Sequence, residues 1–341
     1  MHFMHHHHLP SNLHFLLSIT IALFLSASLF AKDETWEIYH VKLYMENDLI
    51  SQEDSQYTGG SKLDVIYKID NPDSLYNLLN AGDSKVYYFR SFAIASQIYT
   101  PSDLTKKEPI YNDWSYAGWT YVESGIHKSS RDTLNSLILK VGIVGPAAQG
   151  EEIQTAIHRW TGSEIPQGWD NQLYNEPGIN LGYIYKKRYE HIIHNSFTIS
   201  LVPSASFDLG NISTQASLGM FVRLGHHISK DFGISTITMG GESGIPSYDA
   251  QKSNLHHTWG WSLNVAARGS AVARDIFVEG NTFKKSIVTH ERENFVGYIG
   301  AGFSLRYKSW NVDFMQIHNT PRAKDIHKSK TVGTLILTYL Y

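Results

Sequence analysis

The 341-residue chain is long enough for one large domain or two ordinary ones, and only 18% of its residues are charged. Aromatic residues make up 13%, with 20 Tyr and 8 Trp beside 26 Gly. This combination is typical of large β-sheet proteins, because aromatic side chains fit pleated surfaces and glycine fits turns. A net charge of −3 gives no indication of a nucleic-acid partner, and the absence of cysteine excludes thiolate catalysis, cysteine-ligated zinc and disulfides.

The N-terminal segment is typical of an export signal. The run from Phe15 to Phe30 is apolar, is short for a membrane span and ends in small residues. We therefore expect residues 1–31 to be a signal peptide, cleaved after Ala31. A retained N-terminal anchor is the alternative, because the residues before the run include histidines but no Lys or Arg. We expect residues 32–341 to form one domain without a transmembrane helix.

Period-two alternation of apolar with small or polar residues dominates the rest of the chain. It is clear in residues 197–207, 216–224 and 299–307, and residues 335–341 repeat it and end in an aromatic residue. Segments of about ten residues with one apolar face match tilted strands that cross a bilayer. The pattern predicts an all-β fold, a transmembrane antiparallel β-barrel. A soluble β-sandwich or lipocalin-like barrel is the alternative, since its strands also alternate.

The number of strands is open between twelve and fourteen. The segment 232–240 is short and could be a loop. With a periplasmic N-terminus, we expect the segments 47–57, 100–114 and 146–178 on the outer, cell-surface side. The fourteen candidate strands are at residues 36–46, 58–69, 86–99, 115–127, 133–145, 179–190, 194–208, 213–225, 232–240, 257–268, 271–281, 294–308, 310–318 and 331–341.

Residues 149–160 break the alternation and predict a short helix inserted in an outer-side loop. A proline stands shortly before this segment and a glycine shortly after it. Gln154 and His158 are four residues apart, so they share one face of the helix. Glu164 follows the glycine, where the chain can turn back toward that face.

A second polar cluster surrounds the first connection between strands. Glu46-Asn47-Asp48 ends the first expected strand, Asp54 follows, and Tyr57-Thr58-Gly59-Gly60 opens the second. Carboxylate, amide and hydroxyl oxygens are hard ligands that suit Ca²⁺. The alternatives are a polar surface loop, or a cluster that bridges lipopolysaccharide phosphates through divalent ions.

Five motifs in this order resemble those of the lipid A 3′-O-deacylase family, LpxR. The resemblance extends from Asn47 to Asn281, which is most of the chain after the expected signal peptide. Two departures are visible: Gly59 stands where the family usually has Asn, and Trp114-Ser115 replaces an Arg-Pro pair. The matching motifs are Asn47-Asp48, Tyr57-Thr58-Gly59-Gly60, Tyr116-Ala117-Gly118-Trp119, Gly145-Pro146 with Gln154 and His158, and Gly168-Trp169 with Gln172-Leu173.

The resemblance implies a twelve-stranded barrel in the bacterial outer membrane, with its site at the barrel wall in the outer leaflet. It also implies calcium-dependent hydrolysis of the 3′-linked acyloxyacyl chain of lipid A. We therefore expect twelve strands rather than fourteen, lipid A as substrate, outer-membrane lipids as surroundings and a monomeric protein.

The residues fit this chemistry in their own right. Histidine exchanges a proton near neutral pH, so His158 could activate a water for ester hydrolysis. Asn47, Asp48 and Thr58 could hold the metal or the substrate, and Glu164 could ligate the metal or orient His158. A bound Ca²⁺ would act as a Lewis acid on the ester carbonyl. All five are therefore candidate catalytic residues.

Gln154, Tyr57 and Trp119 are the candidate substrate-binding residues, since they belong to the same motifs. Two other functions stay open at this stage. An outer-membrane phospholipase A would also use calcium, but with a Ser/His/Asn set on the barrel wall. A porin or adhesin would use the polar loops as a constriction or a contact surface.

Overall fold

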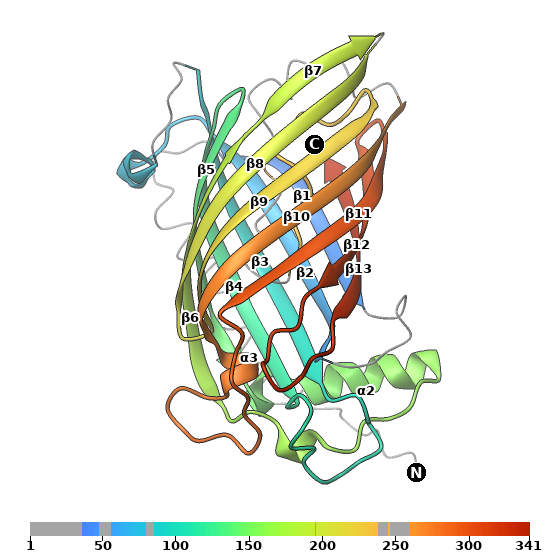
Figure 1. Cartoon of the computed structure of the whole chain (residues 1–341). Coiled ribbons are helices and arrows are strands. Elements are labelled where there is room, and N and C mark those ends of the chain that lie inside the picture. Colours follow the sequence, from blue (N-terminus) through green and yellow to red (C-terminus); the bar gives the residue numbers. More distant parts are fainter. Residues whose placement is uncertain (1–35, 48–55, 80–84, 195, 238–244, 246–258) are drawn as a thin grey trace, which may run out of the picture. The chain divides into compact units, whose positions relative to one another are not determined.

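Antiparallel strands, joined in chain order, make up the sheet that dominates Figure 1. The computed structural model describes residues 36–341 except for 48–55, 80–84, 195, 238–244 and 246–258, so the expected signal peptide lies outside the described residues. The short helices described are η1 (Ser74–Leu78), η2 (Pro146–Ala148), α2 (Gly150–Thr161), η3 (Trp169–Asn171) and α3 (Ile276–Glu279). The strands described are β1 (Trp36–Asn47), β2 (Gln56–Ile69), β3 (Tyr87–Thr100), β4 (Ala117–Ser129), β5 (Thr133–Val144), β6 (Glu176–Lys187), β7 (Tyr189–His194), β8 (Phe197–Gly210), β9 (Ser213–His226), β10 (Trp259–Asp275), β11 (Phe295–Tyr307), β12 (Trp310–Asn319) and β13 (Lys330–Leu340).

The sheet closes on itself. Apart from β6 and β7, which do not pair, neighbours in sequence pair antiparallel, β1 pairs with β13, and β6 pairs with β8. The strands β1–β6 and β8–β13 therefore form a closed twelve-stranded barrel. The extra strand, β7, continues the line of β6 along β8 beyond Arg188. The twelve-stranded expectation is confirmed.

Two details of the fourteen-strand count are wrong. Residues 232–237, the described part of one candidate, form no strand. The candidates at 257–268 and 271–281 belong together as β10, which runs unbroken through Gly269 and ends at Asp275, where α3 begins. The small residues near Gly269 do not turn the chain, because they pair on both sides with β9 and β11.

The outer surface of the barrel is apolar, and its interior carries many buried polar side chains. Along β10, Trp261 and Leu263 are 44% and 58% exposed, whereas Ser262 and Asn264 between and beside them are 2% and 1% exposed. A soluble barrel would bury the apolar residues instead. The inverted pattern is that of a membrane barrel, whose lipid-facing side chains are apolar. Among the described residues, no helix is long and apolar enough to cross a membrane.

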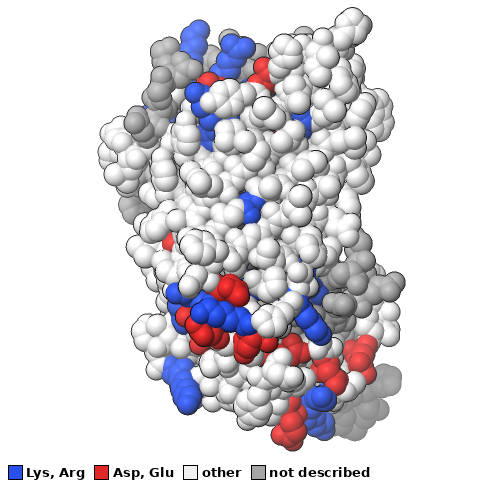
Figure 2. All heavy atoms as spheres, in the orientation of Figure 1, with Lys and Arg blue, Asp and Glu red and all other residues white. Residues whose placement is uncertain are grey.

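Aromatic side chains gather at the end of the barrel away from α2. Trp259 stacks on Tyr307 with ring centroids 4.5 Å apart, and Trp310 meets Tyr339 edge-on at 4.9 Å. Above the charged end of the barrel, Figure 2 shows a broad band with very few Lys, Arg, Asp or Glu side chains. An apolar band bordered by aromatic residues is the arrangement expected at a bilayer.

A segment after β9, residues 228–237, runs inside the barrel; we call it the luminal segment. Phe232 packs in one apolar cluster with residues from strands around the whole ring. The Phe232 carbonyl accepts a hydrogen bond from Lys186 at 3.2 Å, and the Ile237 carbonyl accepts one from Gln97 at 3.2 Å. The interior is therefore crossed by protein rather than forming an open channel.

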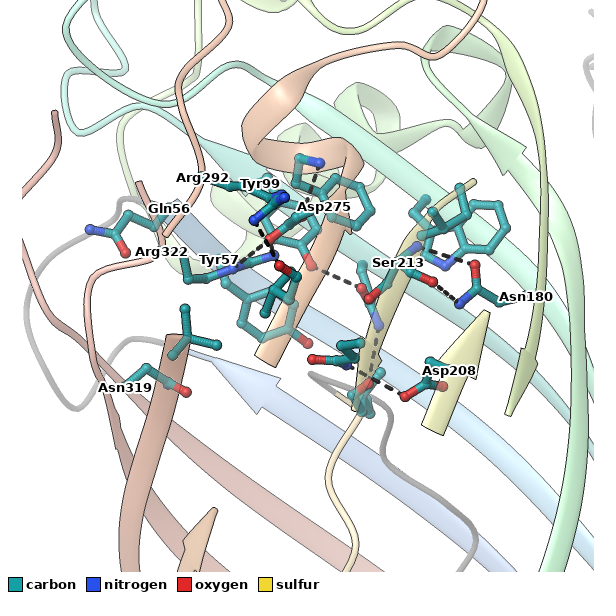
Figure 3. A pocket seen from close by; sticks show the side chains of 18 of the residues that line it. Gln56, Tyr57, Tyr99, Asn180, Asp208, Ser213, Asp275, Arg292, Asn319 and Arg322 are labelled. Carbon is teal, nitrogen blue, oxygen red and sulfur yellow. Dashed lines mark hydrogen bonds and ion pairs between the residues drawn. The ribbon is translucent and has the colours of Figure 1, made fainter. Parts of the chain in front are cut away.

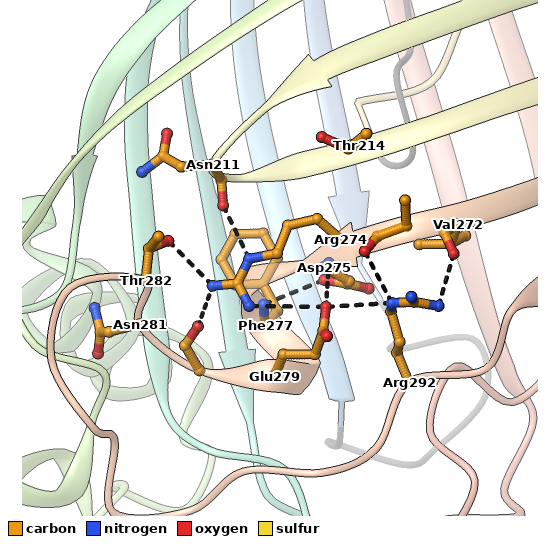
Figure 4. A network of polar contacts seen from close by, with 12 residues as sticks. Asn211, Thr214, Val272, Arg274, Asp275, Phe277, Glu279, Asn281, Thr282 and Arg292 are labelled. Atoms are coloured by element: carbon orange, nitrogen blue, oxygen red, sulfur yellow. Dashed lines mark hydrogen bonds and ion pairs between the residues drawn. The ribbon is translucent and has the colours of Figure 1, made fainter.

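The helix α3 folds over one end of the barrel, the end that also carries α2 (Figure 1). Phe277 stacks on Tyr99 of β3 with centroids 3.9 Å apart. Figure 4 shows Arg274 and Arg292 on either side of Glu279, at 3.7 and 3.5 Å from its carboxylate. Together with the luminal segment, α3 narrows this mouth of the barrel, which disfavours a porin.

Candidate active site

The helix expected from the sequence is α2, Gly150–Thr161, in the long connection between β5 and β6. Glu151 and Glu152 lie in its first turn and Arg159 in its last, which complements the helix dipole. The helix ends at Gly162, whose φ of 74° lies in the left-handed region that glycine tolerates best. Its N–H bonds the His158 carbonyl, so the chain reverses just beyond His158.

His158 is buried and oriented by the chain that follows the helix. Its Nδ1 lies 2.5 Å from the backbone carbonyl of Glu164. A carbonyl only accepts, so Nδ1 carries the proton and donates it, and Nε2 keeps a lone pair. The predicted link between Glu164 and His158 thus exists, but through the backbone, since the Glu164 residue itself is exposed.

Gln154 lies one turn before His158 on the same helix face and is 2% exposed. Its Oε1 accepts a hydrogen bond of 3.0 Å from the indole N–H of Trp169. Its Nε2 has no partner among the described residues. A buried amide with unused donors is costly unless something binds to it, which marks Gln154 as a candidate contact for a substrate oxygen.

Glycines seat the start of α2 directly on the barrel wall. A Cβ on Gly118 of β4 would lie 3.1 Å from the Gly150 nitrogen, and a Cβ on Gly150 would lie 2.7 Å from the Trp169 ring. The Thr120 hydroxyl donates to the Ala148 carbonyl at 2.8 Å. The Tyr-Ala-Gly-Trp motif is thus explained in part by close packing, which a larger residue at Gly118 would prevent.

Thr58 lies on the same outer surface of the wall. Its hydroxyl is 2.6 Å from the hydroxyl of Thr100 at the end of β3, a strand that α2 contacts. Ile98, two residues before Thr100 and on the same face, belongs to one apolar cluster with Trp169. Thr58 and Thr100 therefore lie on the face of β2 and β3 that also carries Ile98, and the Ile98 cluster includes Trp169, which bonds Gln154. Thr100 carried no motif and was not predicted; only the strand register places it.

Tyr57 and Trp119, the other two expected substrate-binding residues, lie on the opposite face. Both line a cavity inside the barrel at the α2 end (Figure 3), among side chains from strands on all sides. The Tyr57 hydroxyl donates to the buried carboxylate of Glu46 at 2.8 Å. The structure therefore does not bring Tyr57 and Trp119 together with His158.

Of the expected metal ligands, Thr58 and Asn47 are placed at neighbouring strand ends. Asn47 pairs with Gly59 across β1 and β2. Asp48 lies outside the described residues. No group of three or more His, Cys, Asp or Glu that could hold a metal occurs in the described part of the chain. The oxygen donors in place are an amide and a hydroxyl, which suit calcium better than a softer metal.

Tyr116 is a second titratable side chain near the Gln154–Trp169 pair, with its ring centroid 4.9 Å from that of Trp169. Burial raises the pKa of Tyr116 to about 12, so the phenol is neutral at physiological pH and cannot serve as a base there. Of Tyr116 and His158, His158 is the one with an unprotonated nitrogen that could accept a proton.

A closed barrel with an apolar outer surface and a helix-covered polar site on its wall defines the class, an outer-membrane β-barrel that crosses the membrane with many strands. The sequence model of one family, described as outer membrane protein LpxR, matches residues 16–341. The chain belongs to the LpxR family of outer-membrane proteins.

The solved structure of an LpxR protein supports the fold assignment. LpxR from Salmonella typhimurium superposes with a TM-score of 0.72 at 18% identity, covering 89% of this chain and 100% of that one. The beta domain of the Bordetella autotransporter BrkA gives a TM-score of 0.44 at 8% identity, covering 90% and 100%. The translocator domain of NalP from Neisseria meningitidis gives 0.39 at 9% identity, covering 97% and 98%. Comparison with curated protein sequences gives no match.

Proposed function

We propose that this protein is a lipid A 3′-O-deacylase, which hydrolyses the ester of the 3′-linked acyloxyacyl chain in the outer leaflet. The observation that carries the proposal is the orientation of His158, buried under the Glu164 carbonyl with Nε2 free to accept a proton. Family membership supports the substrate class. The α2 end then faces the cell exterior, where lipid A resides, and the barrel acts as a monomer.

In the reaction, Nε2 of His158 takes a proton from a water while the water oxygen attacks the ester carbonyl. The bond from Nδ1 to the Glu164 carbonyl holds the imidazole in the tautomer that can do this, and it strengthens when the ring becomes cationic. His158 then returns the proton to the 3′ oxygen of the sugar as the ester bond breaks. The products are the free acyloxyacyl acid and a 3′ hydroxyl.

The free Nε2–H groups of Gln154 would donate to the negative charge that develops on the carbonyl oxygen. The bond from Trp169 to Oε1 fixes which way the amide points, so the donors are in place before substrate binds. Thr58 and Thr100 form the part of the same wall that would face the sugar or the metal.

Calcium is the proposed cofactor. Asn47, Asp48 and Thr58 would supply oxygen ligands, with the exposed Glu164 side chain as a further candidate. A bound Ca²⁺ would polarise the ester carbonyl as a Lewis acid. The Asn47 amide oxygen and the Thr58 hydroxyl, at the adjoining ends of β1 and β2, are oxygen ligands of the type that calcium prefers.

The test is mass spectrometry of lipid A from cells with and without the gene. Expression should give lipid A that lacks the 3′-linked acyloxyacyl chain, and His158→Gln should not. An outer-membrane phospholipase A would instead release fatty acids from glycerophospholipids and leave lipid A intact. A porin or adhesin would change neither lipid.

A further inference from the structure

Glu46 lies next to Asn47 on β1, but its side chain points into the barrel and is buried. Its carboxylate accepts hydrogen bonds from three separate elements. The Tyr57 hydroxyl on β2 donates at 2.8 Å, the Ile237 N–H of the luminal segment at 2.7 Å, and the Thr334 hydroxyl on β13 at 3.1 Å. A buried carboxylate with this many donors fixes the positions of the groups that surround it.

The glycines after Thr58 make room for the bond between Tyr57 and Glu46. A Cβ on Gly60 would lie 2.2 Å from the Tyr57 hydroxyl, so any side chain there would displace it. A Cβ on Gly59 would lie 2.9 Å from the Glu46 carbonyl. The Tyr-Thr-Gly-Gly sequence is therefore shaped around the inward Tyr57, not only around Thr58.

An irregularity in the pairing of β2 with β3 links the two faces of the wall. Tyr57 pairs with Tyr99 and Gly59 with Ile98, which leaves Thr58 as an extra residue, a β-bulge. Bulges redirect side chains. This one lets Tyr57 point inward to Glu46 while Thr58 reaches the Thr100 hydroxyl.

We infer that Glu46 is a positioning residue that acts through the Tyr57 hydroxyl to hold the bulge at Thr58 in its active geometry. The inference rests on the proposed deacylase function. In this view Tyr57 supports the site from the luminal face and does not bind substrate, which replaces the role expected from the sequence. Small displacements of a substrate-facing group affect turnover more than ground-state binding when that group acts mainly in the transition state.

Tyr57→Phe tests this with the smallest change. It removes the hydroxyl and keeps the ring, which packs edge-on against Tyr99 at 5.3 Å. With purified barrel and lipid A in mixed micelles, we expect kcat to fall about tenfold and KM to stay within about twofold, since misplacement of about 1 Å can cost up to about 10²-fold. Glu46→Gln should also lower kcat.

Gly60→Ala supplies a second, independent test. In the wild-type background its methyl group would push the Tyr57 hydroxyl away from Glu46, so kcat should fall as it does in Tyr57→Phe. In the Tyr57→Phe background that hydroxyl is absent, and the closest remaining neighbour of the methyl group is the Ser96 carbonyl oxygen at 3.1 Å. Gly60→Ala should therefore lower kcat clearly less in this background than in the wild type. Fully additive losses would show that the two changes act separately and would overturn the inference.

Tyr76→Phe is the matched control. Tyr76 is also buried and donates to the Phe89 carbonyl at 3.0 Å, but it lies in η1 at the other end of the barrel. It should leave kcat within about twofold. An equal loss of kcat in Tyr76→Phe would count against a positioning role for Glu46. So would a Tyr57→Phe protein that is misfolded, as shown by loss of its heat-modifiable gel mobility, and not merely slower.

The same assay separates this inference from the proposed function. If the wild-type protein does not act on lipid A, the proposed function is wrong. If the wild type is active and Tyr57→Phe is equally active, only the inference is wrong.

Discussion

The two faces of the barrel wall at the α2 end are built from alternate residues of the same strands, and they differ in how their polar groups are used. On the luminal face, the Glu46 carboxylate is bonded by Tyr57, Ile237 and Thr334. On the outer face, α2 packs on β3 and β4, and its buried Gln154 amide keeps its donors unused. A satisfied network holds structure in place, and an unsatisfied one is ready to bind. The outer face is therefore where chemistry is expected, and the luminal face supports it.

The largest effect that tests this division is expected at His158. His158→Gln keeps similar size but cannot take a proton at neutral pH, so deacylation should fall by roughly 10² to 10⁴. The measurement is the rate of acyl release from lipid A, with the amount of heat-modifiable barrel as a folding check. His191→Gln is the control, because His191 is exposed on β7 at the other end of the barrel and should change nothing. Normal deacylation by His158→Gln would show that His158 is not the catalytic base and that the reaction does not depend on the outer-face site.

Calcium removal should come next. Chelation with EGTA should lower activity by about 10²-fold or more, because a Lewis-acid cation contributes several kcal/mol to carbonyl activation. Added Ca²⁺ should restore the rate. The oxygen donors at Asn47 and Thr58 suit calcium, so restoration by Zn²⁺ alone, or full activity in EGTA, would contradict a calcium site.

Gln154→Glu separates the two ends of one side chain. The variant keeps an oxygen to accept from Trp169 but has lost the Nε2 donors. If those donors face the developing oxyanion, kcat should fall by about 10²-fold. Gln154→Ala removes both functions and should lose at least as much. A Gln154→Glu protein with wild-type kcat would show that Gln154 only holds Trp169.

The apolar alternation and the helix were readable from the sequence because each rests on local periodicity. What periodicity cannot show is which surface a residue faces once the register is irregular. Tyr57 and Thr58 are neighbours in one motif, yet a bulge that only strand pairing shows separates their roles. Trp119 belongs to a motif whose glycine seats α2, and its own ring faces the lumen.

The errors in the strand count have the same origin. The residues from Phe232 to Ile237 belong to a strand expected from the sequence, but they lie inside the ring. Phe232 and Ile237 are buried there against side chains of the barrel strands, without backbone pairing to any described strand. Gly269 is a residue type common in turns, yet it pairs with Leu218 of β9 and Gly297 of β11, so β10 continues through it. Sequence composition marks where a chain can bend, and pairing decides whether it does.

The smallest expected effect tests how closely α2 must sit on the wall. Gly118→Ala would place a methyl group 3.1 Å from both the Ala148 Cβ and the Gly150 nitrogen, so the start of α2 must move by a few tenths of an ångström. Because His158 and Gln154 belong to that helix, they move with it, and we expect kcat to fall by roughly fivefold. This is less than the ~10²-fold loss of rate expected for a full 1 Å misplacement. Gly269→Ala, with open space around its Cβ, is the matched control and should stay within about twofold. Equal activity of the two variants, with both barrels folded, would show that the site tolerates a small movement of α2. The position of α2 on the outer face would then matter less for catalysis than the luminal network around Glu46.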